Sequence, residues 1–236
     1  MITSLERITT AGGHPAIFDV RNGTSDAALV GGIIGGREYD LPAGLSGWAI
    51  DIGAHIGIVT VALALDNPDL RIVAVEALPE NIVQLRQNIA LNGLSDRVGV
   101  VSGAAAAESE ANTYVPIVYG WSKAQNQPDH YMADNRYIGG MVGPNTTSMT
   151  VPCLAVTLSE ILSVFKIPEV ALLKIDCEGC EWFFLDSPAL SKVRKVIGEM
   201  HVGRHGGAAR LRELLAGFDV TMDDSLVVAT FEAVRR

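Results

Sequence analysis

Residues 48–57 read W-A-I-D-I-G-A-H-I-G, and residues 71–76 read R-I-V-A-V-E. The first stretch predicts a short apolar strand that runs into a tight turn, where Gly53 lets the backbone approach a ligand and Gly57 lets a helix start against the sheet. The second stretch predicts a neighbouring strand that ends in Glu76, whose carboxylate can accept hydrogen bonds from both hydroxyls of a ribose. Together the two stretches predict a nucleotide-binding βαβ unit.

Asp51 separates two classes of cofactor. A dinucleotide fingerprint has Gly at this position, so that a pyrophosphate can lie on the bare helix N-terminus. A carboxylate there would repel a pyrophosphate, but it would favour a ligand that carries an ammonium and a sulfonium. S-adenosylmethionine is such a ligand. The turn therefore favours this cofactor over NAD, and a NAD-dependent oxidoreductase is the weaker interpretation.

Composition limits the class of protein further. The 236 residues are 48% hydrophobic, which is enough for one substantial core, so we expect one main domain. The net charge is -9 and the basic residues are scattered, which argues against nucleic acid or an anionic membrane as a partner. No apolar run reaches the roughly 18 residues of a membrane span, and three cysteines are too few for a disulfide framework. We expect a cytoplasmic protein that acts on a small molecule. The sequence is also compatible with a homodimer.

Apolar runs alternate with helical patterns from Trp48 onward, which predicts a doubly wound α/β sheet. The expected strands are 48–52, 71–76, 98–102, 170–175 and 193–201, the expected helices are 57–65, 79–91, 158–165 and 207–215, and 218–222 with 226–231 form a terminal antiparallel hairpin. Residues 1–46 hold β-prone pieces at 16–20 and 28–34 and predict a β-rich flap before the main unit 47–236. Residues 105–150 form a long insertion with no convincing helix, and such a loop is a candidate substrate lid.

With these pieces in place, the chain is similar to the FkbM-like family of S-adenosylmethionine-dependent methyltransferases over roughly residues 39–231. The likeness lies in D-I-G-A-H-I-G at 51–57 with V-E-A-L-P-E-N at 75–81, in L-L-K-I-D-C-E-G-C-E at 172–181, and in E-M-H at 199–201. The resemblance implies a Rossmann-like, seven-stranded sheet with its last strand antiparallel. It also implies methyl transfer, most often to a hydroxyl of a sugar, polyketide, peptide or other secondary metabolite. The chain departs from the family at His55, where Asn is usual, and at Cys177 and Cys180, where small apolar residues are usual.

The residues expected to bind the cofactor lie at or near the carboxyl ends of the predicted strands, where open α/β sheets hold their ligands. Glu76 would hold the ribose, and Gly103 with Ala104 would border the adenine, as the family pattern suggests. The full expected set is Asp51, Gly53, Ala54, His55, Gly57, Glu76, Ala77, Gly103, Ala104 and Asp176.

Three residues are the candidates for catalysis. Glu199 and His201 project to the same side of their strand because side chains alternate, and Asp176 ends the neighbouring strand. We expect His201 to be the general base, oriented by Glu199 or Asp176. The same two carboxylates and imidazole could instead hold Mg²⁺ or Mn²⁺. Lys174, in a buried strand, should pair with an acid, because an unpaired buried ammonium is costly.

Other interpretations remain open at this point. His201 could be a strand-end histidine without a catalytic role, and Glu178 and Glu181 could complement a helix dipole as easily as touch a substrate. Zinc at Cys177 and Cys180 would need a second pair of ligands, so we interpret both as small apolar replacements. The sulfonium could also serve aminocarboxypropyl transfer or cyclisation, and a non-catalytic binding module could keep the same fold.

Overall fold

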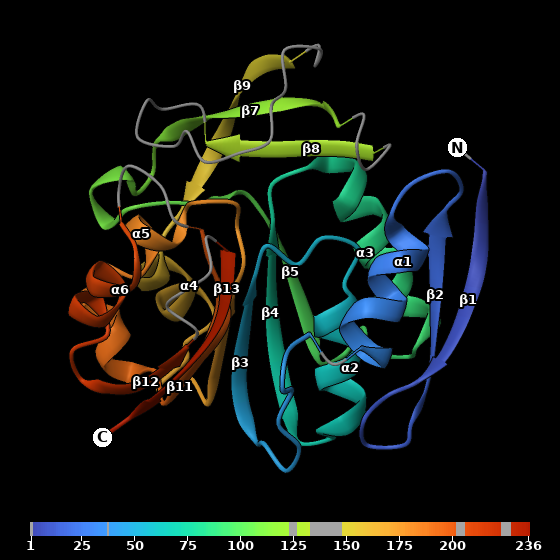
Figure 1. The fold of residues 1–236 in the computed structure, drawn as a ribbon, viewed down its shortest axis with the longest axis horizontal. Coiled ribbons are helices and arrows are strands. Elements are labelled where there is room, and N and C mark those ends of the chain that lie inside the picture. Colours follow the sequence, from blue (N-terminus) through green and yellow to red (C-terminus); the bar gives the residue numbers. More distant parts are fainter. Residues whose placement is uncertain (1, 37, 123–126, 133–147, 202–205, 223–227) are drawn as a thin grey trace.

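The computed structural model describes residues 2–36, 38–122, 127–132, 148–201, 206–222 and 228–236. Its centre is a seven-stranded sheet in the order β12-β13-β11-β10-β3-β4-β5 (Figure 1). The pairs β11·β10, β10·β3, β3·β4 and β4·β5 are parallel, whereas β13 runs antiparallel to both β11 and β12. The doubly wound sheet with one reversed strand is therefore confirmed, as is the terminal hairpin.

The elements of this sheet follow the predicted ranges closely. Its strands are β3 Gly47–Ile52, β4 Leu70–Glu76, β5 Val98–Ser102, β10 Leu172–Ile175, β11 Lys195–His201, β12 Phe218–Met222 and β13 Val228–Arg235. Its crossover helices are α2 Ile58–Asp66, α3 Pro79–Leu91, α4 Leu158–Val164, α5 Glu181–Phe184 and α6 Ala208–Leu214, with a 3₁₀ turn η3 at Pro188–Lys192. The strand expected at 170–175 begins later, because Val170 forms only an isolated bridge with Val193. The bounds of α3 and β5 agree with the predicted ranges. For α3 the signals are local, since Pro79 starts the helix and Asn92-Gly93 ends it.

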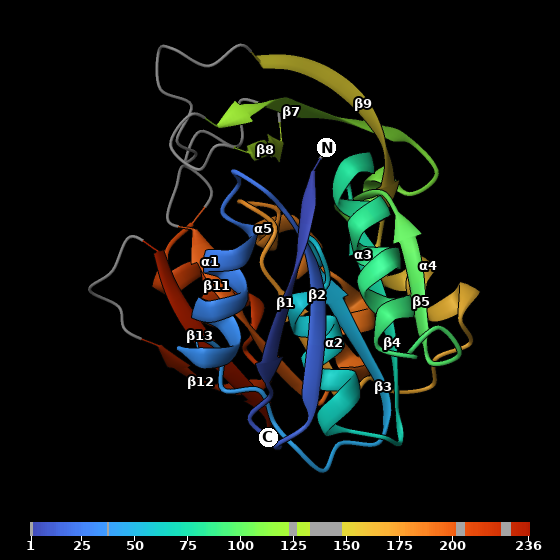
Figure 2. The same cartoon turned by 90° about the vertical axis from the view of Figure 1, so that its right-hand side faces the viewer.

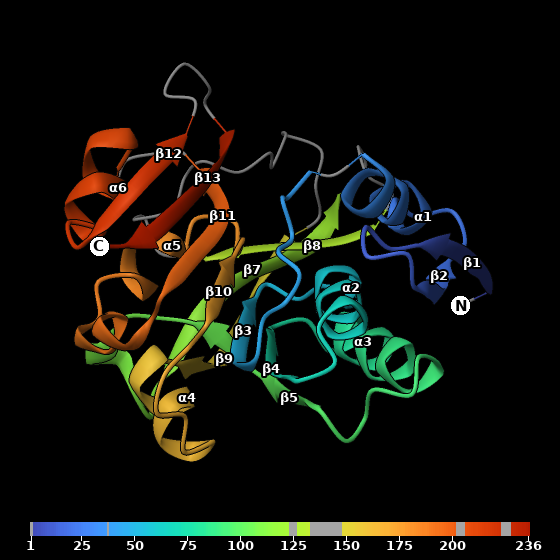
Figure 3. The same ribbon diagram turned by 90° about the horizontal axis from the view of Figure 1, so that it is seen from below.

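Helices cover both faces of the sheet (Figure 3). Helices α2 and α3 pack on one face, where Ile56, Leu63 and Leu85 are fully buried together with residues of the N-terminal segment. Helices α4, α5 and α6 pack on the other face, around buried residues such as Leu158 and Phe184. The two cores leave the ends of the parallel strands as the place where polar side chains can gather.

The N-terminal segment is only partly the β-rich flap that the sequence predicts. Strands β1 Thr3–Thr9 and β2 Pro15–Arg21 form an antiparallel hairpin beside α2 (Figure 2). The piece expected as a strand at 28–34 is helical instead, as α1 Asp26–Val30 and the π-helical turn η1 Gly31–Gly35. A short apolar run does not distinguish strand from helix. The tertiary structure decides it here, because the buried carboxylate of Asp26 accepts hydrogen bonds from the backbone and side chain of Arg21.

The described part of the insertion is a second sheet, which corrects the expectation of an irregular loop. Strands β6 Ala104–Ala105, β7 Tyr114–Ser122, β8 Gln127–Met132 and β9 Ser148–Val156 pair in the order β6-β9-β7-β8, and a 3₁₀ turn η2 spans Glu108–Glu110. This sheet lies across one end of the central sheet (Figures 1 and 2). Tyr137 and the rest of 133–147 lie outside the described residues, and whether the insertion acts as a lid stays a prediction. Among the described helices, none is long and apolar enough to cross a membrane.

Candidate active site

The glycine turn after β3 depends on backbone geometry. Gly53 and Gly57 have φ of 71° and 90°, in the left-handed region that favours glycine. A Cβ atom at Gly53 would also overlap the carbonyl oxygen of Asp176 at the end of β10. The N–H groups of Gly53 and Ala54 both donate to the carbonyl oxygen of Val75, each at 3.0 Å. The turn is thus wedged between the ends of β4 and β10, and only glycine fits at position 53.

Glu76 fastens this turn to the helix that follows the next strand. Its Oε2 accepts a hydrogen bond from the backbone N–H of His55 at 2.8 Å, and its Oε1 accepts from the N–H groups of Ala77 and Leu78. His55 has a φ of 51°, a conformation that Asn and His tolerate better than most residues. The contact of Glu76 with a ribose stays a prediction.

Asp51 has a different surrounding from the one expected. Its carboxylate is fully buried: Oδ1 lies 3.3 Å from Nζ of Lys174, and Oδ2 accepts a hydrogen bond of 2.6 Å from the hydroxyl of Thr60. Lys174 also donates to the carbonyl oxygen of Gly53 at 3.0 Å. The predicted pairing of Lys174 with an acid is confirmed. Burial alone would lower the pKa of Lys174, but the charges of Asp51, Asp176 and Glu199 and the hydrogen bond to Asp51 together outweigh it and raise that pKa. The carboxylate of Asp51 is bound to Lys174 and Thr60 in the interior. Asp51 therefore stabilises the turn from within the core and does not face a ligand.

A cavity of about 20 Å³ lies at the turn, which is room for about one water molecule. Four residues of the expected cofactor set line it: Gly53, Ala77, Gly103 and Ala104. The remaining lining residues are Ile52, Val75, Ala105, Ile117 of the insertion, Cys177 and Cys180. The sequence carried no signal for Ile117, since its place depends on how β7 folds back over the strand ends. Pockets for drug-sized ligands have volumes of about 300–1,000 Å³, so this cavity is much smaller than such a pocket.

Cys177 and Cys180 are joined by a disulfide bond, with Cα atoms 5.4 Å apart. Our interpretation of both as small apolar replacements is therefore wrong, although both are buried. Glu178 and Gly179 between them have φ of 55° and 103°, and these two left-handed residues turn the chain back so that the cysteines meet. The C-x-x-C spacing permits this contact but does not by itself determine it. Cys153 is a free thiol.

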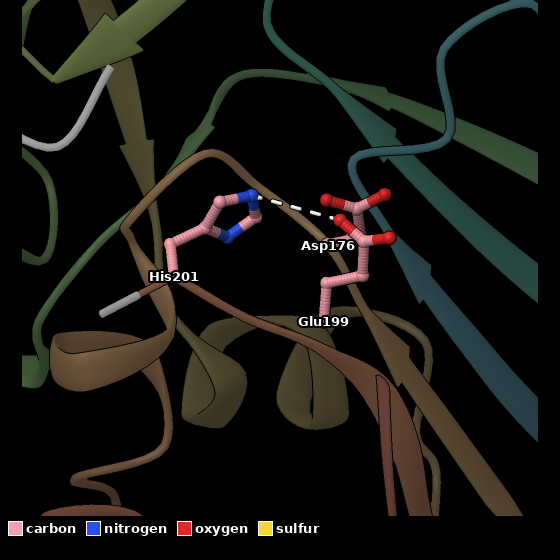
Figure 4. Close-up of side chains that lie close together, drawn as sticks. All are labelled: Asp176, Glu199 and His201. Carbon is pink, nitrogen blue, oxygen red and sulfur yellow. Dashed lines mark ion pairs between the residues drawn. The ribbon is translucent and has the colours of Figure 1, made fainter. Parts of the chain in front are cut away.

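His201 lies among carboxylates at the end of β11. Ligand atoms of Asp176, Glu199 and His201 all lie within 4.8 Å of one another (Figure 4). The Nε2 atom of His201 is 3.6 Å from Oε2 of Glu199 and 3.6 Å from Oε2 of Glu178. The structure therefore brings the three predicted catalytic residues together, and it places a third carboxylate, that of Glu178, beside them.

Glu181 holds His201 from the other side. Its Oε1 atom forms a hydrogen bond with Nδ1 of His201, and the side chain is fully buried at the start of α5. Next to it, Trp182 donates from Nε1 to the carbonyl oxygen of His201 at 3.1 Å. Sequence reasoning expected Glu199 or Asp176 to orient the imidazole, but the residue that does so is Glu181. With Nδ1 engaged in this way, Nε2 is the atom that faces the acidic cluster.

The carboxylates change the proton affinity of the histidine. Burial would lower the pKa of His201, but the hydrogen bond to Glu181 and the charges of Glu181, Glu178 and Asp176 outweigh it and raise that pKa to about 10. Burial and the charge of Asp176 raise the pKa of Glu199 to about 8. The cluster therefore retains protons at neutral pH.

The N-terminal segment also reaches this cluster, which the sequence did not indicate. The hydroxyl of Tyr39 donates a hydrogen bond of 2.9 Å to Oδ2 of Asp176, and the ring of Tyr39 is buried. The carboxyl of Glu38 hydrogen-bonds Glu199 and contributes to its raised pKa. Burial and the nearby charge of Asp176 raise the pKa of Tyr39, so this phenol stays protonated and fixes the orientation of the carboxylate.

The fold is that of the class I methyltransferases, a Rossmann-like fold with a reversed strand in its sheet. The Methyltransferase FkbM domain matches residues 51–221 of the sequence. The chain therefore belongs to the FkbM methyltransferase family, whose cofactor is S-adenosylmethionine. This result argues against the NAD-dependent interpretation.

Two curated relatives match parts of the chain. The AMB antimetabolite synthetase AmbE of Pseudomonas aeruginosa is 25% identical over 77% of this chain, and the O-methyltransferase imqG of Aspergillus flavus is 39% identical over 24% of it. The matches span only 10% and 23% of the length of these two relatives. Among solved structures, the precorrin-6y C5,15-methyltransferase of Geobacter metallireducens has a TM-score of 0.52 at 12% identity, covering 93% of this chain and 94% of that protein. This last likeness concerns the fold alone.

Proposed function

We propose that this protein transfers a methyl group from S-adenosylmethionine to a hydroxyl of a small molecule, with His201 as the general base. The observation that carries the proposal is the imidazole at the end of β11, whose Nδ1 is held by the buried Glu181 and whose Nε2 faces the acidic cluster. A histidine fixed through one nitrogen presents the other in a defined direction, as proton transfer requires. The name of imqG, an O-methyltransferase, supports the choice of a hydroxyl.

We propose that the cofactor occupies an enlarged form of the cavity at the glycine turn. Gly53 allows close backbone approach, Ala77 and Glu76 border the ribose, and Gly103 with Ala104 borders the adenine. His55, Ala54 and Gly57 shape the turn, and Asp51 acts through Lys174 by keeping the backbone of the turn in place. The site thus has two halves, the glycine turn and the acidic cluster around His201. Asp176 joins them, because its carbonyl packs on Gly53 while its carboxylate belongs to the acidic cluster.

The transfer itself is an in-line displacement at a sulfonium, so the protein has to align the acceptor and exclude water. The acceptor hydroxyl would lie beside Nε2 of His201 and lose its proton to it as the new bond to carbon forms. In the free protein this nitrogen is protonated at neutral pH because of the raised pKa. The positive sulfonium, placed nearby, would lower that pKa and release the base form.

A divalent cation is a second candidate for activating the hydroxyl. Asp176, Glu199 and His201 would offer two carboxylate oxygens and one imidazole nitrogen, and Mg²⁺ or Mn²⁺ suit such ligands. Glu181 would then be the carboxylate behind the metal-bound histidine, an arrangement common around bound metals. Bound metal would polarise the acceptor oxygen and take the place of the protons that the cluster holds.

The acceptor is a small molecule in our proposal because the net charge of -9 disfavours polyanions, and the name of AmbE, an antimetabolite synthetase, supports secondary metabolism. The test is to measure S-adenosylhomocysteine release with sugar, polyketide and amine acceptors, each with EDTA and with Mg²⁺ or Mn²⁺. A hydroxyl-dependent release supports the proposal, and a rate restored only by metal identifies the cation mechanism. Methylthioadenosine as the product would show that the sulfonium chemistry is not methyl transfer. Absence of S-adenosylhomocysteine binding in calorimetry would contradict the proposal.

A further inference from the structure

The loop that carries the disulfide connects the two halves of the site. Asp176 precedes Cys177, and Glu181 follows Cys180. Asp176 accepts the hydrogen bond from Tyr39, and Glu181 holds Nδ1 of His201. A change in this loop therefore acts on both acids at once, in addition to its effect on the cavity wall.

The same two cysteines form part of that wall. Both line the cavity together with Gly53, Ala77 and Ile117, and Cys177 and Cys180 are 9% and 2% exposed. In the disulfide form the cavity has room for about one water molecule. The bonded pair thus holds one wall of the proposed cofactor site in a position that leaves no room for a nucleoside.

Several features make this disulfide suited to reversible chemistry. Only two residues separate the cysteines, so the bond restricts the unfolded chain little and contributes little stability. Glu178 has a left-handed backbone, which is unfavourable for a non-glycine residue, and this strain would be relieved when the loop relaxes. C-x-x-C is also the spacing used by thiol-disulfide exchange proteins.

We propose that Cys177 and Cys180 form a reversible thiol–disulfide pair that controls cofactor binding: the disulfide closes the cavity, and reduction to two thiols lets the loop move outward. A dithiol supplies the two electrons and two protons. One of its thiolates attacks a sulfur of the pair, most directly that of the more exposed Cys177, to form a mixed disulfide and release the Cys180 thiolate, which takes up a proton. The second thiolate of the dithiol then attacks the dithiol's own sulfur in the mixed disulfide, which closes a cyclic disulfide and releases the Cys177 thiolate to take up the second proton.

This inference rests on the proposed position of the cofactor, and the experiment separates the two. The full chain is equilibrated in reduced and oxidised dithiothreitol at stepped ratios, blocked with a maleimide and weighed by mass spectrometry. Of the 3 cysteines, one label is expected in the disulfide form and three in the reduced form. Calorimetry then measures the affinity of the disulfide form and of the reduced form for S-adenosylhomocysteine. We expect the reduced form to bind at least tenfold more tightly.

Linkage gives an independent readout of the same coupling. A ligand that prefers the reduced form tenfold shifts the midpoint of the redox titration by about 30 mV toward easier reduction. Saturating S-adenosylhomocysteine should therefore raise the midpoint by about this amount. The double variant C177A/C180A should show no difference between the two buffers, whereas Cys153→Ser should keep the wild-type response.

The contrary outcomes are distinct. Three labels in every buffer would show that no disulfide forms and would overturn the inference. A disulfide that forms without changing the affinity, or that tightens binding, would overturn the coupling while leaving the proposed function in place. Failure of the wild type, in both forms, and of C177A/C180A to bind S-adenosylhomocysteine would instead contradict the proposed function.

Discussion

The two halves of the site lie at the same edge of one sheet but are built in different ways. At the ends of β3 and β4, backbone groups dominate: the glycine turn donates to Val75, and Glu76 accepts from three backbone N–H groups. At the ends of β10 and β11, side chains dominate, with His201 surrounded by carboxylates. The first half is sensitive to shape, whereas the second is sensitive to charge. The two should therefore respond differently to mutation and to pH.

His201→Gln should have the largest effect and should affect only the charged half. The amide can still donate to Glu181, but it cannot accept a proton, so we expect kcat to fall about 10²–10⁴-fold. The affinity for S-adenosylhomocysteine should stay within a few-fold of the wild type, as measured by calorimetry. Unchanged turnover would remove His201 from the mechanism, and a parallel loss of cofactor affinity would show that the two halves are not separable.

Gly53→Ala should damage the backbone half. The added Cβ overlaps the carbonyl oxygen of Asp176 and also forces a left-handed alanine, so we expect a loss of about 2 kcal/mol or more in the free energy of unfolding. Gly93→Ala is the matched control, because Gly93 has a φ of 69° but open space around it, and its loss should be about 1 kcal/mol. Chemical denaturation and cofactor titration of both variants check this. Equal losses would show that the turn is not wedged against β10.

Glu181→Gln should give a smaller effect that appears in the pH profile. In the folded protein the pKa of His201 is raised from 6.5 to about 10, so the stability gained from its charged form is complete below pH 6.5 and is lost as the pH rises through 10. The variant should lose part of this stability, because Glu178 and Asp176 remain, and it should move the alkaline rise in kcat/KM to lower pH, with a roughly tenfold lower maximum.

Glu178→Gln provides the comparison for this shift. Its carboxylate is 3.6 Å from Nε2 and is 45% exposed, so its removal should move the pH profile less. Thermal unfolding and initial rates from pH 6 to 10 measure both variants. A larger shift from Glu178 than from Glu181 would contradict the orientation that we assign to the imidazole.

The backbone half could be predicted from the sequence because its signals are local. Glycines at 53 and 57, an acid after an apolar strand and a proline that starts the next helix are all adjacent in the chain to the structure they determine. The prediction did not extend to Asp51, whose carboxylate contacts Lys174 rather than facing the cavity. Position in the sequence placed Asp51 at the turn, but the strand pairing of β3 with β10 decided its partner.

The charged half was predicted only in part. Asp176, Glu199 and His201 were recognised as strand-end residues, whereas Glu181 and Tyr39 were not assigned to the site. Tyr39 is 137 residues from the carboxylate that it contacts, so no local pattern reports the contact. Residues 28–34 were predicted as a strand for a related reason, because a short apolar run takes its conformation from what it packs against.

By itself, the sequence determined the doubly wound sheet, the glycine turn, the strand-end acids and the methyltransferase family of this protein, since each depends on residues close together in the chain. Only the tertiary structure decided which carboxylate holds His201, how the insertion covers the cavity and that Cys177 meets Cys180. These features depend on distances between segments that the chain brings together only when it folds, and on the burial that changes the proton affinity of each group.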